Sequence, residues 1–274
     1  MVEAVLLVLR EILEAAMIIS LLLALSRQLN QNHRWILIAV MIGLLGSWLL
    51  GHYAYAIAES LDGQGQELLN ASLYLAVVLS AMLLSLHIIP LSIAVWKNRL
   101  PDAAQGYVQH SLYGLFIVTV SCSVAREGSE IWIYLSGFIH QPAVLESALI
   151  GGAIGAGIGM SLGAIAYYLF VFMPRKYFLP LCLVMVTLVM GGLAMQVAKQ
   201  LMQIGWLDST APLWDSSFVV SEQSWLGQLL YALLGYDASP DATQIIFYLV
   251  AILPTLMGIL WHATRLKESH YVQR

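Results

Sequence analysis

Apolar residues dominate seven stretches of this chain, and polar residues gather in the segments between them. A helix needs about 20 apolar residues to cross the hydrocarbon core of a bilayer, and each stretch reaches that length. The pattern therefore predicts an all-α integral membrane protein with seven transmembrane helices in one domain, residues 1–274. The expected spans are residues 2–26, 35–58, 68–96, 111–137, 147–173, 178–203 and 243–263.

Two of the seven stretches contain the same charged motif. The first has Arg-Glu-Ile-Leu-Glu at residues 10–14, and the fourth has Arg-Glu-Gly-Ser-Glu at residues 126–130. A charged side chain at membrane depth costs about 2.5–3.5 kcal/mol even on lenient insertion scales. We therefore expect these side chains to face one another, water or a bound ion, and to form the functional site.

The composition agrees with a membrane protein. Hydrophobic residues make up 60% of the chain and charged residues 10%, and the mean hydropathy is +0.80, which is outside the range of soluble domains. The first stretch does not resemble a cleavable signal peptide, because it begins with Glu3 rather than a basic region and no small-residue cleavage site follows it. We expect it to remain as a helix.

The distribution of charge predicts the orientation. Of the 12 basic residues, nine lie in the first, third and fifth connections or at the C-terminus, and Lys199 alone lies on the other side. Because Lys and Arg favour the cytoplasmic side, we expect an outside N-terminus and an inside C-terminus. The acidic outer face suits cations and not nucleic acid. The nine inner basic residues are Arg27, Arg34, Lys97, Arg99, Arg175, Lys176, Arg265, Lys267 and Arg274.

The chain also contains an internal repeat with a spacing of 116 residues around the motifs. A repeat of three helices is odd, so its second copy runs through the membrane upside down, and such repeats place substrate sites near the midplane. We expect an inverted 3+3 repeat over residues 1–100 and 108–203, and a seventh helix with an inner tail at 243–274. The matching residues are Val8, Arg10, Glu11, Glu14 and Ser20, against Val124, Arg126, Glu127, Glu130 and Ser136.

The segment between the sixth and seventh spans, residues 204–242, is the longest connection and is expected outside. Trp206, Trp214 and Trp225 are residues that prefer the membrane interface. Ser221 is a suitable N-cap for a helix over residues 222–234, which ends at Gly235. We predict an interfacial helix there.

The motif geometry predicts a metal site. Residues three apart share a helical face, so Glu11 projects with Glu14 and Glu127 projects with Glu130. If the two helices cross antiparallel, four carboxylates converge, with an arginine (Arg10 or Arg126) beside each pair. Carboxylates suit hard cations such as Mg²⁺, Ca²⁺, Mn²⁺ or ferric iron. Four glutamates and two arginines carry a formal charge of −2, which one divalent cation neutralises.

A structural role and a proton relay are the alternatives at these residues. Each arginine is spaced to pair with the glutamate four residues later in its own motif, which would make the motifs simple ion pairs. That arrangement leaves Glu11 and Glu127 unexplained. A buried carboxylate without a partner takes up a proton, which keeps a proton relay open.

Two other functional classes have weaker support. A membrane carboxylate-metal oxidase would be expected to carry Glu-x-x-His, and neither motif has histidine there. A proton-coupled carrier of an organic cation would need a roomy pocket lined by aromatic residues. His52 and His87 are secondary candidates for a metal ligand or proton relay, although a single membrane histidine is more often a packing residue.

At its two motifs the chain resembles the high-affinity iron permeases, a family that includes the fungal ferric permeases and the bacterial Efe-type permeases. The hallmark of that family is Arg-Glu-x-x-Glu on the first and fourth of seven helices, and residues 10–14 and 126–130 match it fully. The outer segment is similar to the bacterial branch at residues 213–215, 234–236 and Pro240, so the resemblance extends over essentially the whole chain.

The resemblance implies a permease, not an enzyme, that imports iron across the bacterial cytoplasmic (inner) membrane. Its transported substrate is Fe²⁺ or Fe³⁺, with no tightly bound cofactor, and the motif glutamates are the metal ligands. Another hard divalent cation, such as manganese or lead, is the alternative substrate. The family also implies periplasmic iron-binding or iron-oxidising partners. Many members have an acidic residue near the start of helix three, where this chain has Asn70, so Glu67 is the candidate for a secondary site.

Overall fold

A computed structural model describes residues 1–96, 105–221, 224, 226–227, 230 and 236–271. Within these residues the chain is helical and contains no strand. Seven helices of 19 residues or more account for most of the described part. They are α1 (Val2–Gln28), α2 (Arg34–His52), α4 (Gly65–Trp96), α5 (Gln105–Ser136), α6 (Pro142–Phe172), α7 (Arg175–Gln203) and α9 (Ala242–Tyr271).

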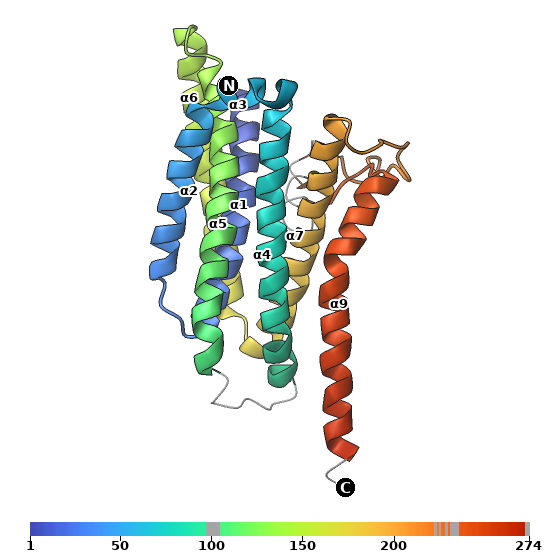
Figure 1. Ribbon diagram of the computed structural model, residues 1–274. Coiled ribbons are helices and arrows are strands. Elements are labelled where there is room, and N and C mark those ends of the chain that lie inside the picture. The colour runs from blue at the N-terminus through green and yellow to red at the C-terminus, as the bar shows by residue number, and fades with distance from the viewer. Residues whose placement is uncertain (97–104, 222–223, 225, 228–229, 231–235, 272–274) are drawn as a thin grey trace.

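The helices pack as three pairs with one helix added at the edge. The pairs are α1 with α6, α2 with α5, and α4 with α7, and α9 packs against α7 and α4. Figure 1 shows that α1 and α5 run in opposite directions and that the two termini lie at opposite ends of the bundle. The helices that carry the two motifs also contact each other, as α1 touches α5.

Small residues allow two of these pairs to approach closely. In the pair of α1 with α6, a Cβ on Gly155 of α6 would collide with the backbone of Val5. In the pair of α2 with α5, a Cβ on Gly43 would meet the side chain of Val124. Small residues at such crossings are typical of membrane helix pairs, in which close van der Waals packing drives association.

An apolar core fills the half of the bundle that contains the C-terminal end of α1. Leu25, Trp35, Leu84 and Phe116 are fully or almost fully buried there. Trp35 packs on Phe116 with ring centroids 5.0 Å apart, and its indole nitrogen donates to the Ser26 hydroxyl at 3.0 Å. This satisfied, close-packed region separates the motifs from that end of the protein.

The second expected span is wrong in its extent. Residues 35–58 were expected to form one helix, but α2 ends at His52, and a separate short helix, α3 (Ala54–Glu59), follows. A 3-10 turn, η1 (Leu61–Gly63), then leads into α4. No residue of α3 is buried, and Asp62 and Gly63 take positive φ values of 60° and 89°, so the chain bends over the end of the bundle here.

Other helices differ from expectation chiefly in length. α5 begins six residues earlier than predicted, α6 five and α7 three, and α9 extends beyond the apolar run to Tyr271. Pro142 is tolerated in the first turn of α6, where a backbone N–H would lack a partner in any case. The interfacial helix predicted over residues 222–234 falls mostly outside the described residues.

Five of the long helices are long and apolar enough to cross a membrane, as expected of an integral membrane protein. The two long helices that fall outside this set are α1 and α5, which carry the charged motifs. The most apolar surfaces of the bundle face outward, where a soluble protein would expose polar side chains. They are the surfaces that lipid would cover.

Candidate metal centre

The crossing of α1 and α5 brings carboxylates of both motifs together. Glu11, Glu14 and Glu127 are all buried, and a ligand oxygen from each lies within 4.8 Å of the others. All four motif glutamates were expected to converge here; these three do, and Glu130 does not.

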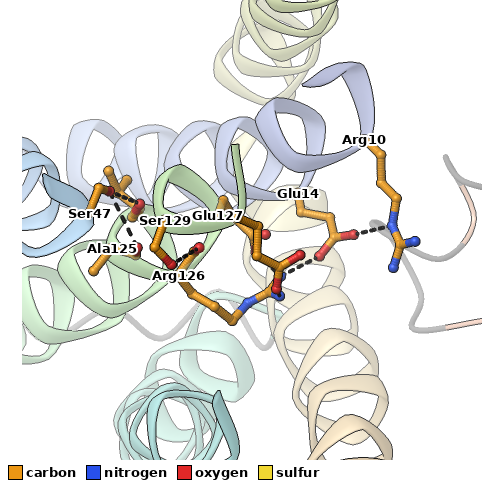
Figure 2. Close-up of polar contacts among 9 residues, drawn as sticks. Arg10, Glu14, Ser47, Ala125, Arg126, Glu127 and Ser129 are labelled. Carbon is orange, nitrogen blue, oxygen red and sulfur yellow. Dashed lines mark hydrogen bonds and ion pairs between the residues drawn. The ribbon is translucent and has the colours of Figure 1, made fainter. Parts of the chain in front are cut away.

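Arg126 links these carboxylates to one another. Its guanidinium donates to Glu14 across the helix crossing at 2.9 Å, to Glu127 beside it, and to Glu130 at 2.7 Å. Glu14 also accepts a hydrogen bond from Arg10 at 3.2 Å, so it lies between the two arginines (Figure 2). Both ion pairs spaced four residues apart, which the structural alternative predicts within the motifs, are therefore formed.

The two arginines have different surroundings. The Arg126 side chain is 6% exposed, whereas that of Arg10 is 48% exposed. Glu130 is also at the margin, at 35% exposed, and it is not one of the three clustered carboxylates. The sequence predicted one arginine beside each pair of glutamates, but the structure places Arg126 at the centre of both motifs.

Tyr74 of α4 closes one side of the site. The centroid of its ring lies 4.3 Å from the guanidinium carbon of Arg126, and the ring is buried. An aromatic face stabilises a desolvated cation by about 2 kcal/mol, so Tyr74 holds Arg126 in place without using its hydrogen-bond donors. Those donors remain directed at the carboxylates.

A cavity of about 20 Å³ lies beside Glu14 and Arg126, with walls from α1, α4, α5 and α7. A water molecule needs about 10–15 Å³, so the space accepts about one such group. An organic cation is far larger, which counts against the carrier interpretation. The main polar residues that line the cavity are Glu14, Ser123, Arg126 and Glu127.

Two carboxylate oxygens in the cluster have no hydrogen-bond partner within the described part of the chain. They are Oε2 of Glu11 and Oε2 of Glu127, and both are buried. A buried, unpartnered carboxylate oxygen is costly unless a cation or proton satisfies it. Three ionised carboxylates beside one buried guanidinium leave excess negative charge, which a bound cation or protons would balance.

A serine of α2 bonds the backbone of α5 just before the second motif. The Ser47 hydroxyl donates to the Val124 carbonyl at 2.8 Å and approaches the Ala125 carbonyl at 3.3 Å. Figure 2 shows this contact on the side of α5 that faces away from Glu14. A Cβ on Gly128 would collide with the same hydroxyl, which gives the glycine of the second motif a packing role.

The secondary candidates do not join this cluster. Glu67 lies in the first turn of α4, with one buried oxygen that lacks a partner, and it does not line the cavity. His52 stacks on Trp48 at 5.6 Å, and the His87 ring nitrogen lies 2.7 Å from the Leu83 carbonyl of its own helix. Both histidines therefore have the packing environments that single membrane histidines usually have.

Two residues of the site were not recognised in the sequence. Tyr74 has no signal in its own span, because its partner Arg126 lies 52 residues away and nothing in the α4 pattern indicates the contact. Ser123 had a usable signal, since it lies three and four residues before Arg126 and Glu127 and therefore shares their helical face.

Comparisons with known proteins cover nearly the whole chain. The model of the iron permease FTR1 family matches residues 1–268. The chain is 25% identical over 261 residues to the ferrous iron permease EfeU of Escherichia coli, covering 93% of this chain and 94% of the relative. It is 24% identical over 254 residues to the ferrous iron permease EfeU of Yersinia pestis, covering 90% and 89%. No solved structure matches the chain significantly.

Proposed function

The chain belongs to the iron permease FTR1 family, and from that premise we propose that it imports iron through a site of motif glutamates between α1 and α5. The observation that carries the proposal is the buried cluster of Glu11, Glu14 and Glu127. Intramembrane carboxylates at this density are expected on an ion path. A permease, rather than an enzyme, is also what the family indicates.

The ion we propose is Fe²⁺. The four motif glutamates and two arginines carry a formal charge of −2, which a divalent ion neutralises without displacing an arginine. The similar bacterial proteins are named ferrous iron permeases. Fe²⁺ accepts oxygen ligands, and the two unpartnered oxygens of Glu11 and Glu127 would supply them. Mn²⁺ has similar ligand preferences and is the competing substrate.

We propose seven membrane crossings, with the N-terminus outside and the C-terminus inside. The opposite placement of the two termini in Figure 1 supports an odd number of crossings. Charges that are satisfied inside the bundle allow α1 and α5 to cross as well, although they are less apolar than the other five. The inner membrane of a bacterium is the proposed location, and periplasmic iron-binding or iron-oxidising proteins are the proposed partners at the acidic outer face.

The inverted repeat is proposed from the register of helix contacts as well as from the motifs. Contacts between α1 and α6 have counterparts between α5 and α2. Adding 116 to the residue number on α1 gives the residue on α5, and subtracting 112 from the residue number on α6 gives the residue on α2. Glu11 and Glu127 also differ by 116, so this pair would lie on the pseudo-two-fold axis. The matched contacts are Val5–Gly155 with Ser121–Gly43, Ile12–Gly159 with Gly128–Ser47, and Ala16–Gly163 with Trp132–Gly51.

The small cavity favours a mechanism in which the ion sheds its water. An ion with a full hydration shell does not fit in about 20 Å³, so protein oxygens must replace most of that shell. Passage inward would then require the two repeats to rock against each other or Arg126 to release a carboxylate. Both movements would open the apolar core on the far side of the site.

The test is iron uptake into proteoliposomes that contain the purified protein, with radiolabelled iron offered in reduced or oxidised form. We expect uptake of reduced iron, with Mn²⁺ as the strongest competitor among Mn²⁺, Zn²⁺ and Pb²⁺. Glu127→Gln, which keeps the shape and removes the charge, should abolish it. Glu146→Gln is the control, because Glu146 is exposed at the start of α6. Wild-type uptake by Glu127→Gln would overturn the proposal.

A further inference from the structure

Ser123 lies on α5 one turn before the second motif, on the side of the ion site that faces the apolar core. Its side chain is 4% exposed and lines the same cavity as Glu14, Arg126 and Glu127. Since residues four apart share a helical face, Ser123 and Glu127 address the cavity together. Ser123 is therefore part of the cavity wall, one helical turn from Glu127 toward the apolar core.

The Ser123 hydroxyl has no hydrogen-bond partner among the described residues. This is unusual in the bundle, because many other helical hydroxyl groups donate to a carbonyl three or four residues earlier in their own helix, and Ser20 and Ser47 donate to a carbonyl of another helix. Ser121 and Ser129, on the same helix, both do so. A buried hydroxyl that makes no such bond forfeits about 1–3 kcal/mol unless something in the cavity satisfies it.

Two small adjoining cavities lie next to this hydroxyl. The polar cavity measures about 20 Å³, and a second cavity of about 30 Å³ continues from it along α5. The second cavity is lined almost entirely by apolar side chains, with Thr119 as its polar member. The two share Ile18, Val77, Val189 and Leu193, so Ser123 lies just before the transition from polar to apolar walls.

We propose that the Ser123 hydroxyl oxygen is a further ligand of the transported ion, on the inward side of the glutamate cluster. The inference rests on the proposed function, since it concerns the same ion. A serine hydroxyl is a hard, neutral oxygen donor, so it raises the number of ligands without changing the formal charge of −2 that balances a divalent ion. It also provides a contact that an ion can reach as it leaves Glu127 toward the core.

The experiment replaces this hydroxyl and a matched hydroxyl that faces elsewhere. Ser121 is the control, because it is buried on the same helix two residues away, bonds the Ile117 carbonyl, and lies beside Gly43 of α2 rather than the cavity. Ser123→Ala, Ser123→Cys, Ser121→Ala and Ser121→Cys are reconstituted into liposomes. Half-saturating Fe²⁺ concentration, maximal uptake rate and inhibition by Cd²⁺ are measured, and monodisperse protein yield is recorded for each.

Loss of a ligand should raise the half-saturating Fe²⁺ concentration about 10- to 100-fold in Ser123→Ala, the range found when groups that support a metal site are removed. Ser123→Cys places a softer sulfur at the site and should increase inhibition by Cd²⁺ about tenfold or more, because thiol ligands favour soft metals. Both Ser121 variants should behave like the wild type. A packing role for Ser123 would not change metal preference.

The possible failures are distinguishable. If both Ser123 variants match their Ser121 counterparts in half-saturation and Cd²⁺ inhibition while Glu127→Gln is inactive, the hydroxyl is not a ligand and the proposed function stands. If Glu127→Gln transports iron like the wild type, the glutamate site itself is rejected, and the ligand role of Ser123 with it. Should Ser123→Ala not fold, the Cd²⁺ response of the nearly isosteric Ser123→Cys decides the question alone.

Discussion

The two copies of the charged motif have the same charged residues at the same spacing, yet they have different structural roles. In the second copy, Arg126 is buried, contacts Tyr74 and holds carboxylates from both motifs. In the first copy, Arg10 is half-exposed and holds Glu14 of its own helix. The repeated sequence therefore places glutamates of both motifs in one cluster, but it places the two arginines in different environments.

The difference follows from where each motif lies in the packing. α5 contacts α1, α2 and α4, so a side chain on its motif is enclosed by several neighbours. α1 packs mainly against α6, and Arg10 points away from that contact toward the edge of the cluster (Figure 2). The first motif thus contributes carboxylates to the cluster, while the second also contributes the arginine that links them.

Removing each arginine gives the largest expected contrast. Arg126→Ala leaves Glu127 buried without its cation and Glu14 with Arg10 alone, and breaking a buried ion pair in this way costs about 3–5 kcal/mol. Arg10→Ala removes a half-exposed partner, and such pairs contribute at most about 1 kcal/mol. Unfolding of the purified variants in mixed detergent micelles measures both. Equal losses of stability in the two variants would show that the arginines are equivalent after all.

The helix pairs that carry the motifs can be compared next. A Cβ on Gly155 would meet the backbone of Val5 and Leu9, whereas a Cβ on Gly43 would meet the Cβ and Cγ1 of Val124, of which only the Cγ1 can rotate away. Overpacking typically costs about 1–3 kcal/mol, so both substitutions should fall in this range, with Gly155→Ala the more costly. The readout is again unfolding in micelles.

Gly157 provides the control for that comparison. It lies on the same helix as Gly155, and a Cβ there would have no neighbour within 4 Å. Gly157→Ala should therefore be neutral or slightly stabilising, since alanine is the better helix former. If Gly155→Ala were as harmless as Gly157→Ala, the close approach of α1 and α6 would not exist in the folded protein.

The third contrast concerns the contact between Arg126 and the ring of Tyr74, which Arg126 makes in addition to its ion pairs. Tyr74→Leu removes the ring from Arg126 and should cost about 1–2 kcal/mol, the value of a desolvated cation–π contact. Tyr74→Phe keeps the ring face and should lose much less. Iron uptake by the two variants, with inserted protein quantified, tests whether the contact also matters for transport. Equal defects in Tyr74→Phe and Tyr74→Leu would show that the hydroxyl, and not the ring, is the important group.

Much of this arrangement was accessible from the sequence, because it depends on periodicity. Long apolar runs located the seven long helices, and the three-residue spacing of Glu11 and Glu14 placed both on one face. The break after His52 was not predictable, since the apolar pattern continues through Tyr53 and the chain bends there only to reach α4. The central position of Arg126 was also not predictable, because identical motifs give no sign of which neighbours will enclose them.

The smallest expected difference is between two serines that correspond in the proposed repeat. Ser20 donates to the Gly163 carbonyl of α6 at 2.7 Å and so joins two helices, whereas Ser136 donates to the Ile133 carbonyl within α5. Hydrogen bonds between membrane helices average about 0.6 kcal/mol, so Ser20→Ala should lose about that much stability. Ser136→Ala should lose almost none, because its bond contributes nothing to the contact between helices. Since each effect is small, the two variants are best compared in one background, such as Gly157→Ala, with repeated unfolding measurements. If Ser136→Ala is the more destabilised of the two, the hydrogen bonds of these two serines do not share the asymmetry between the motif helices. The asymmetry would then be confined to the arginines.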